Sequence, residues 1–306
     1  VDDIARLAHG LDLVGILAHG PIGAAFWHSE GTRHAWQRNL SLWDYSVYAH
    51  GDKAIKRQTS GAQWDAAAFE RQLTEVRARL PILDQPPREL APGPYRAWLT
   101  PAAMESVLDL LSWNGFSAKA QRTRQSVLQR VVQGSAALDA RVSLAEDTAG
   151  GMAAPFGPTG FAKPAFLPLW QAGRHAGSLC SPRTAREYGL ATDGCADDEA
   201  PISLSMAAGE LPDRDVLAAL GTGLWIDNLW YLNFSDRDAC RMTGMTRFAT
   251  LWVQDGVPVA PVAAMRFDDT LERMLGSELV ALGAEAPWCI DALTWRRRST
   301  RSTRVP

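Results

Sequence analysis

The sequence predicts an α+β fold whose C-terminal part is mainly β, with a large antiparallel sheet and a few helices. Residues 248–253 are apolar, aromatic or β-branched, which suits a pleated and half-buried surface. Asp255-Gly256 then supplies the positive-φ positions of a tight hairpin turn, and residues 257–262 return as a second strand. Between residues 142 and 203 helical periodicity is poor, which also favours strands and loops.

The first 85 residues predict short strands followed by one helix. Strands are expected at 13–18, 24–27 and 40–49, and the sequence from His50 to Gly61 reads as a turn and a polar strand. A helix is expected over 64–80, with Asp65 as N-cap and Pro81 ending it. Its apolar stripe consists of Phe69, Leu73, Val76 and Leu80. The Pro-rich stretch 82–94 is the best candidate for a linker.

Two helices are expected in the segment after this linker. A short strand at 95–99 precedes Thr100-Pro101, which is typical of an N-cap followed by Pro at the first helical position, and this helix should run to about Ser112. A second helix, from about 117 to 132, carries a basic run that is usually a solvated face; a phosphate or peptide site is the alternative. The run consists of Lys119, Arg122, Arg124 and Arg130.

The rest of the chain predicts strands, with one more helix near the end. Strands are expected at 166–169, 177–180, 202–207 and 223–234, and 192–203 reads as an acidic loop. After the 248–262 hairpin, Asp268 should cap a helix whose apolar face holds Leu271, Met274, Leu275 and Leu279. The tail contains a short basic run, 296–304, which is weak support for nucleic-acid binding in a net acidic chain.

Composition narrows the classes of protein. The chain has 306 residues, 46% of them hydrophobic and 21% charged, which indicates a packed protein of one large or two ordinary domains. A net charge of −3 offers no general reason to bind nucleic acid or anionic membrane. No apolar stretch reaches the ~18 residues of a membrane span, and the N-terminus lacks a signal-peptide pattern. The four cysteines form no CxxC pair, so free thiols in the reducing cytoplasm are expected.

A segment rich in arginine and methionine, 236–247, is the candidate contact site. An ordinary surface loop explains it adequately, but a peptide or partner contact is the functional interpretation, because arginine grips carboxylates and methionine adapts to varied apolar side chains. The residues concerned are Arg237, Arg241, Met242, Met245 and Arg247. Trp225 and Trp230 should lie on opposite faces of one strand, one in the core and one available to a neighbour.

Three stretches carry a resemblance to a known family. GLWIDNL (223–229), RMTGMTRFATLWVQDG (241–256) and APV (260–262) together resemble the C-terminal domain of the TldD/TldE (PmbA) family, the paired subunits of a cytoplasmic metalloprotease that trims peptides. The resemblance implies a truncated N-terminal α/β domain over 1–85 and a β-rich TldD/PmbA-like domain over 86–306.

The residues expected for zinc catalysis are missing. In catalytic subunits of this family, a helix early in the C-terminal domain carries a His-Glu-…-His motif that binds zinc and activates water. The corresponding stretch here, 101–130, contains no histidine, and Cys289 stands in PWCID rather than in the Gly-rich context of the family's cysteine ligand. The chain therefore resembles the TldE type of subunit. It is expected to have no catalytic or metal-binding residues of its own, and zinc is expected in a TldD-type partner.

Other catalytic patterns receive little support. His28 and His34 bracket Glu30, but the intervening Gly31 makes a metal-binding helix improbable, and His175 with Cys180 is better explained by core or surface roles. No G-x-S-x-G elbow is present. The leading hypothesis is a non-catalytic subunit, paired with a TldD-type partner or self-associated, that handles peptides. The alternatives are a stand-alone binding or scaffold protein and a peptidase with an unrecognised site.

Overall fold

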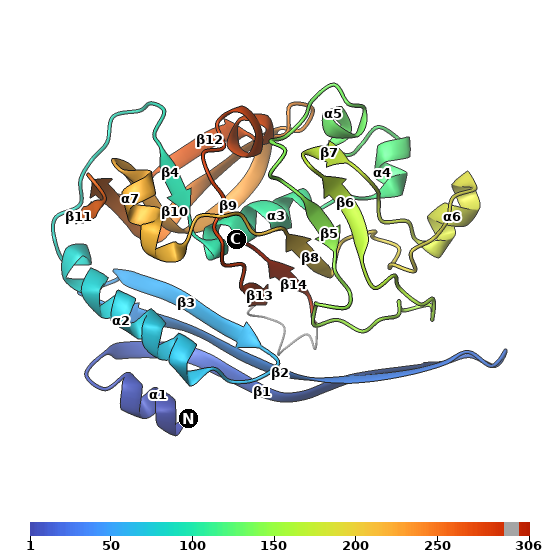
Figure 1. Cartoon of the computed structure of the whole chain (residues 1–306), viewed down its shortest axis with the longest axis horizontal. Helices are drawn as coiled ribbons and strands as arrows, with labels where there is room; N and C mark the ends of the chain where they lie inside the picture. The colour runs from blue at the N-terminus through green and yellow to red at the C-terminus, as the bar shows by residue number, and fades with distance from the viewer. Residues whose placement is uncertain (291–299) are drawn as a thin grey trace.

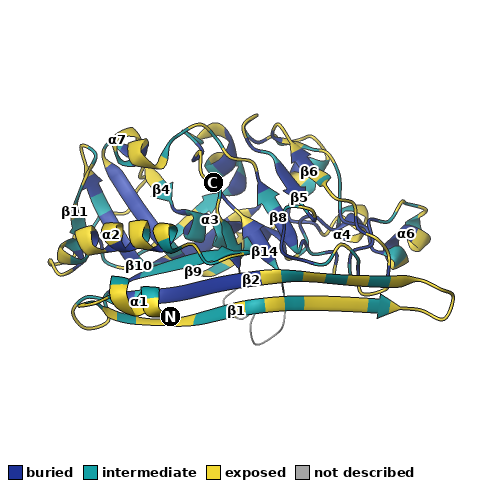
Figure 2. Cartoon of the chain, turned by 60° about the horizontal axis from the view of Figure 1, so that its bottom comes forward, coloured by how far each residue is buried: buried dark blue, intermediate teal, exposed yellow. Residues whose placement is uncertain are grey.

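The computed structural model describes residues 1–290 and 300–306, which form a mixed α+β structure with three sheets (Figure 1). The first sheet is antiparallel in the order β1-β2-β3, with β1 (Asp12–Trp27), β2 (Arg33–Tyr48) and β3 (Ala54–Gly61). The strands expected at 13–18 and 24–27 are one continuous strand, because β1 is an edge strand and tolerates Pro21. The far end of the β1–β2 hairpin is largely exposed and projects beyond the other elements (Figure 2).

Helix α2 (Ala66–Leu83) covers this sheet, and a short helix α1 (Asp2–Leu7) lies beside it. The Asp65 side chain accepts a hydrogen bond from the backbone N–H of Ala68 at 2.9 Å, which confirms the predicted N-cap. Phe69 packs edge-on against Tyr45 of β2. The helix continues through Pro81 to Leu83, so the predicted end is wrong. A proline so close to the C-terminus removes only one backbone hydrogen bond, and a single lost bond in the last turn is tolerated.

The second sheet has the order β11-β10-β9-β4, and β12 also pairs with β10. Its strands are β4 (Ala97–Leu99), β9 (Gly223–Asp236), β10 (Arg241–Gln254), β11 (Val257–Pro261) and β12 (Arg266–Thr270). The predicted hairpin is confirmed, since Asp255 and Gly256 both have positive φ (50° and 78°). The helix predicted from Asp268 is wrong, because residues 266–270 pair with 241–245. Only a short helical segment follows, which includes η2 (Arg273–Ser277) and keeps Leu271 and Leu275 buried.

Helix α3 (Pro101–Leu111) begins and ends where the sequence predicts, with Thr100 as its N-cap. The helix predicted over 117–132 is wrong as a single element, because it divides into α4 (Ala118–Arg122) and α5 (Gln129–Val132). The break follows from Arg124, which has φ +57°, and from the buried Ser126, whose hydroxyl donates to the carbonyl of Gly115 at 2.9 Å.

The third sheet has the order β13-β14-β8-β5-β6-β7. Its strands are β5 (Leu144–Glu146), β6 (Leu167–Gln171), β7 (Arg174–His175), β8 (Ser203–Met206), β13 (Trp288–Ile290) and β14 (Ser302–Arg304). The strands predicted near 166–169 and 202–207 are confirmed. The strand predicted at 177–180 is wrong, because that segment makes only an isolated bridge between Leu179 and Ser117. Of the basic tail, 296–299 lies outside the described residues.

Besides α1, three helical segments of the described residues were not expected from the sequence. They are α6 (Pro182–Tyr188), η1 (Asp213–Asp215) and α7 (Val216–Leu220). Helix α6 starts with Ser181 as N-cap and Pro182 as its first residue, the same signal that predicts α3. The signal at Ser181-Pro182 was therefore present in the sequence.

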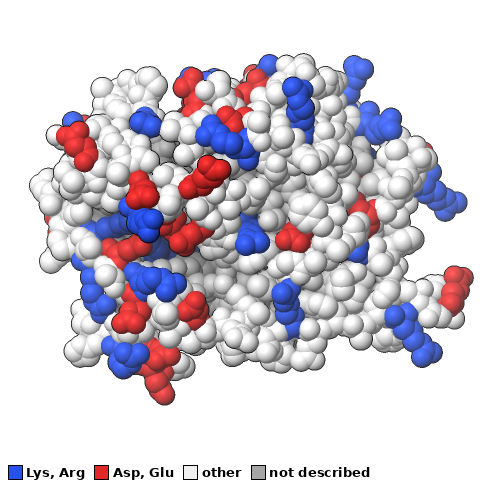
Figure 3. Space-filling view, in the orientation of Figure 1, with Lys and Arg blue, Asp and Glu red and all other residues white. Residues whose placement is uncertain are grey.

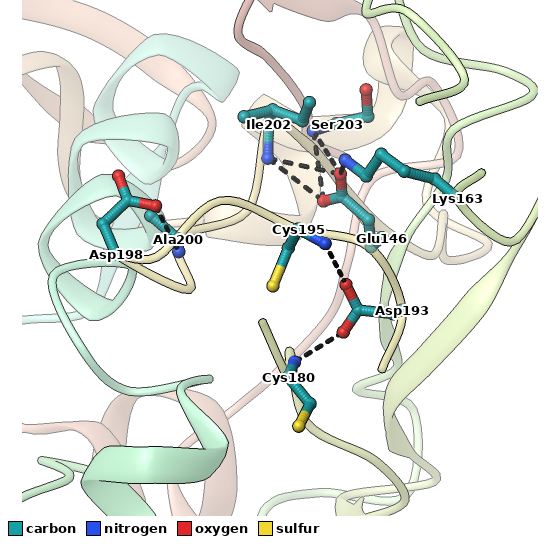
Figure 4. Close-up of polar contacts among 9 residues, drawn as sticks. All are labelled: Glu146, Lys163, Cys180, Asp193, Cys195, Asp198, Ala200, Ile202 and Ser203. Atoms are coloured by element: carbon teal, nitrogen blue, oxygen red, sulfur yellow. Dashed lines mark hydrogen bonds and ion pairs between the residues drawn. The ribbon is translucent and has the colours of Figure 1, made fainter. Parts of the chain in front are cut away.

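Buried carboxylates organise the segment that has little regular structure (Figure 4). Glu146 accepts hydrogen bonds from the backbone N–H groups of Ile202 and Ser203, and it pairs with Lys163 at 2.9 Å. Asp193 accepts from the backbone N–H groups of Cys180 and Cys195 at 2.5 and 2.9 Å. Two acidic residues of the predicted acidic loop, Asp193 and Glu199, therefore turn inward and bind backbone N–H groups, whereas Asp197 and Asp198 are exposed.

Two buried clusters form most of the core. One joins α3 to the second and third sheets, and the other joins the first sheet and α2 to β9, β10 and α7. The N-terminal elements thus share a core with the second sheet. Within the part of the chain that the structure describes, no helix is both long and apolar enough to pass through a lipid bilayer.

Candidate functional site

Register shifts interrupt the β9–β10 pair at three places, two of which contain a residue with a positive φ value. Tyr231 on β9 and Phe248 on β10 have positive φ values, 53° and 56°, and the register between the strands shifts near both residues. Such a conformation costs a non-glycine residue about 1 kcal/mol or more, and it persists only where surrounding contacts impose it. The bulge at Tyr231 interrupts the inside–outside alternation of β9, so two successive aromatic rings face solvent.

The two exposed rings and two side chains of β10 form a surface that we call the aromatic patch. It consists of Trp230, Tyr231, Met245 and Arg247. Trp230 and Tyr231 stack with ring centroids 4.2 Å apart, and Met245 lies directly opposite Trp230 in the strand register. The Arg247 guanidinium carbon lies 3.5 Å from the centroid of the Trp230 ring. The exposed fractions of Trp230 and Tyr231 are 45% and 67%, which is unusual for side chains of this size.

The patch adjoins a free strand edge. β4 pairs with β9 only at Leu224–Ile226, so the outer edge of β9 beyond these residues has no neighbouring strand among the described residues. A free edge can accept an additional strand, and tryptophan, tyrosine and arginine are the residues that contribute most to protein interfaces. This arrangement can bind an extended peptide or a partner subunit.

The five candidate contact residues occupy different environments. The prediction of a loop over 236–247 is wrong, because 241–247 belong to β10 and only a tight turn connects the strands. Met245 and Arg247 lie in the aromatic patch. Arg241 pairs with Asp268, and Arg237 lies over the Phe234 ring at 5.4 Å. Met242 is fully buried in the core, so it cannot contact a partner on this surface.

Tyr231 is the patch residue that the sequence analysis did not single out. Its neighbour Trp230 is exposed, as expected for one face of the strand, whereas Trp225 is buried. The adjacent Trp-Tyr pair was a usable signal, because strict alternation would bury one of two neighbouring aromatic residues unless a bulge intervened.

The stretch GLWIDNL (223–229) contains a buried carboxylate that links two sheets. Asp227 is fully buried and accepts hydrogen bonds from Arg57 of β3 at 2.9 Å and from the Trp225 indole at 2.7 Å. Arg79 of α2 lies over the Trp225 ring at 4.2 Å. We call Arg57, Arg79, Trp225 and Asp227 the buried junction, because it links the first sheet and α2 to the second sheet.

Helix α3 occupies the position at which the zinc-binding helix was expected. Its buried side chains are all apolar: Ala103, Met104, Val107, Leu108, Leu110 and Leu111. Asp109 is paired with Arg301 at 2.7 Å. Burial, followed by the charge of Glu105, raises the pKa of the Cys289 thiol. The buried face of α3 therefore consists of apolar side chains and offers no imidazole or carboxylate to a zinc ion.

The remaining histidine and cysteine candidates do not combine into a metal site. His28 lies in the turn of the β1–β2 hairpin, and His34 stacks on Phe156 with its Nε2 atom 2.9 Å from the carbonyl oxygen of Gly160. All four cysteines are free. No group of three or more His, Cys, Asp or Glu side chains within residues 1–290 and 300–306 is arranged to hold a metal ion.

Comparison with known proteins identifies a domain family that matches the sequence and solved structures that share the fold. The sequence pattern of the PmbA/TldA metallopeptidase C-terminal domain matches residues 92–306. Among solved structures, TldE from Thermococcus kodakarensis aligns with a TM-score of 0.76 at 11% identity, covering 100% of this chain and 70% of TldE. A proposed modulator of DNA gyrase from Thermotoga maritima aligns with a TM-score of 0.73 at 13% identity, and the alignment covers 100% of this chain and 71% of that protein. A protein of the same description from Bacteroides thetaiotaomicron aligns with a TM-score of 0.75 at 15% identity, and the alignment covers 100% of this chain and 67% of that protein.

No curated protein matches this chain. The three structural relatives share too little sequence to establish more than the fold, and that fold has the mixed α+β architecture that the sequence predicts. The domain match covers more than half of the chain and includes every stretch that carries the resemblance to the TldD/TldE family. The chain belongs to the PmbA/TldA metallopeptidase family.

Proposed function

We propose that this chain is a non-catalytic subunit of a cytoplasmic metalloprotease complex of the TldD/TldE type, which processes or degrades unfolded peptides. A TldD-type partner supplies the zinc ion and the carboxylate that activates water. The observation that carries the proposal is helix α3, which offers an apolar face where the catalytic subunits of the family place their zinc ligands. Family membership and the likeness of the fold to TldE from Thermococcus kodakarensis support the same assignment.

The aromatic patch is the proposed contact surface. Its tryptophan and tyrosine side chains are exposed in the isolated chain and its arginine is half-buried, and their stacking holds them in one arrangement before a partner binds. The free edge of β9 beside the patch allows the partner, or a peptide within the complex, to add backbone hydrogen bonds. In this role the four candidates that are not buried act together, because Arg237 and Arg241 extend the surface toward the turn.

The assignment is tested by producing the chain alone and together with a TldD-type subunit from the same genome. The complex is expected to contain zinc in proportion to the partner and to cleave an unfolded peptide, whereas the isolated chain should do neither. Zinc is measured by elemental analysis, stoichiometry by light scattering and cleavage by mass spectrometry. An isolated chain that holds one tightly bound zinc ion and cleaves the peptide would contradict the proposal and favour a stand-alone peptidase.

The contact surface is tested in the same experiment with a double variant, Trp230→Ala with Tyr231→Ala. Hot-spot aromatics contribute about 2 kcal/mol or more each, so affinity for the partner should fall roughly a hundredfold or more. Phe166→Ala is the matched control, because Phe166 is a comparably exposed aromatic residue on another part of the molecule. Equal affinity of the double variant and the control would exclude the patch. A chain that binds no TldD-type subunit would instead favour an independent binding or scaffold protein.

A further inference from the structure

A cavity of about 450 Å³ is lined by none of the residues of the aromatic patch or the buried junction. Its lining comes from α4, α5, β7 and the segments on either side of α6, which come together at the upper right of Figure 1. Its volume is within the range of small-molecule sites, about 300–1,000 Å³. Ala118, Val132 and Leu190 supply apolar walls, and the polar lining comes from Gln121, Arg122, His175 and Ser178.

A directional chain of hydrogen bonds forms the polar wall. The Gln121 amide nitrogen donates to the carbonyl of Gly115 at 3.3 Å, so the amide oxygen faces Ser178, whose hydroxyl donates to it at 2.5 Å. The hydroxyl proton of Ser178 therefore lies in the hydrogen bond to Gln121. His175 Nε2, which lies 3.0 Å from the Ser178 oxygen, must donate to that oxygen. In this order the Ser178 hydroxyl donates to Gln121 and not to His175, so the three side chains form a hydrogen-bonded polar wall suited to binding.

The charged group of the cavity is Arg122. Among the described residues its guanidinium has no ion pair or hydrogen bond, and no carboxylate lines the cavity. By contrast, Arg130 of the same basic run is paired with Glu272 at 3.0 Å. Basic side chains with few acidic ones among them cover this part of the surface, over α4 and α5 (Figure 3). An unpaired guanidinium beside apolar walls favours an anion that carries an apolar group.

We propose that this cavity binds a carboxylate attached to a small apolar group. Arg122 would hold the two carboxylate oxygens in its fork, and Val132 and Leu190 would contact the apolar group. The carboxylate could belong to a free organic acid or to the C-terminus of a peptide, since both present the same chemistry to the site. A single guanidinium suits a carboxylate better than a phosphate, which usually gathers several donors, because Gln121, Ser178 and His175 are already hydrogen-bonded to one another.

The isolated chain is titrated with N-acetyl-leucine, with the tripeptide Ala-Ala-Leu and with the same tripeptide carrying a C-terminal amide, by calorimetry or NMR. Saturable binding with a Kd of about 0.1–1 mM is expected for the free carboxylates. The amide should bind at least about tenfold more weakly, because it lacks the charge that Arg122 pairs with. Tighter binding of the tripeptide than of N-acetyl-leucine assigns the site to peptide C-termini, and comparable binding assigns it to free acids.

Arg122→Ala should weaken binding of the carboxylates roughly tenfold or more. Lys119→Ala is the matched control, because Lys119 is an exposed cation of the same helix that does not line the cavity. Both positions are exposed, so both variants should fold, which circular dichroism checks. Three results would overturn the proposal: no saturable binding, binding unchanged by Arg122→Ala, or tighter binding of inorganic phosphate. The test needs neither zinc nor a partner, so its outcome is independent of the proposed subunit role.

Discussion

Strand β9 carries two tryptophans five residues apart, and each is in contact with an arginine. Trp225 lies under Arg79 at 4.2 Å and Trp230 lies beside Arg247 at 3.5 Å. The first pair is buried, with 9% of Trp225 exposed, whereas 45% of Trp230 is exposed. The difference arises from what covers them, because α2 packs over the first pair and the second lies on a bulged strand with a free edge.

The comparison shows that one contact chemistry can have two roles. In the buried junction the Trp225 indole also donates to Asp227, and that carboxylate accepts from Arg57. The aromatic ring, the guanidinium groups and the carboxylate are therefore paired with one another inside the protein. In the aromatic patch Tyr231 continues the stack, but no carboxylate of the described residues pairs with Arg247 there. A cation–π contact contributes about 2 kcal/mol or more when desolvated and about 0.5–1 kcal/mol when exposed. The buried pair therefore stabilises the fold, and the exposed pair remains available for recognition.

The largest expected effect tests this contrast directly with one substitution at each tryptophan. Trp225→Ala should lower the free energy of unfolding by about 3–5 kcal/mol, because it opens a cavity and removes a partner of Asp227. Trp230→Ala should cost less than about 1 kcal/mol in the isolated chain. Urea denaturation followed by tryptophan fluorescence measures both values. Similar losses for the two variants would mean that the patch is part of the stabilising core.

An intermediate effect is expected when the charge of the junction is removed. Asp227→Asn keeps the side-chain volume but leaves Arg57 buried without its anion, which should cost about 3 kcal/mol. The control is Asp268→Asn, which breaks the exposed pair with Arg241 and should cost less than about 1 kcal/mol. Urea denaturation measures the free energy of unfolding of both variants. If Asp227→Asn costs no more than the control, the ion pair does not hold the sheets together.

The smallest effect concerns the pH dependence near α2, where charged side chains of both signs gather (Figure 3, left). Burial, then Glu285 and Glu75, raises the pKa of Asp213 from 3.8 to about 6. A carboxyl group whose pKa is higher in the folded state binds its proton more tightly there, so stability is lost as the pH rises through about 6. Because Asp213 is exposed, water screens the effect, which should amount to a fraction of a kcal/mol.

Asp213→Asn should therefore raise the melting temperature slightly near pH 7 to 8 and remove part of its decline between about pH 4 and pH 7. Thermal unfolding of wild type and variant across this range checks the prediction. Trp230→Ala should leave the slope unchanged, because no carboxyl group with a raised pKa lies in the aromatic patch. A steeper decline in the Asp213 variant would show that the carboxylate stabilises the fold.

Much of the fold could be predicted from local signals. The Asp255-Gly256 turn, the capped start of α2 and the Thr100-Pro101 start of α3 all depend on a few adjacent residues, and all are present. Helix α6 was missed although its local signal was present, but other failures occurred where partners elsewhere in the chain decide the outcome. Residues 266–270 form a strand because β10 offers them a pairing edge, and 117–132 is two helices because Ser126 bonds to Gly115.

The candidate site was predictable in part. Arg237, Arg241 and Met245 are exposed and Arg247 is half-buried, but residues 241–247 are strand rather than loop, and strand alternation together with a register shift buries Met242. Tyr231 joins the patch only because a bulge turns it outward. The cavity beside Arg122 draws its walls from four separate segments, so no local pattern could have revealed it.

The sequence by itself determined the family resemblance, the absence of histidine from the stretch 101–130 and the position of the main hairpin, because these depend on residue identity and on neighbours a few positions away. Only the tertiary structure decided which tryptophan became part of a junction, which arginine stayed unpaired and which acidic residues turned inward. Those outcomes depend on the free energy of burying a group beside partners that the chain brings close only when it folds.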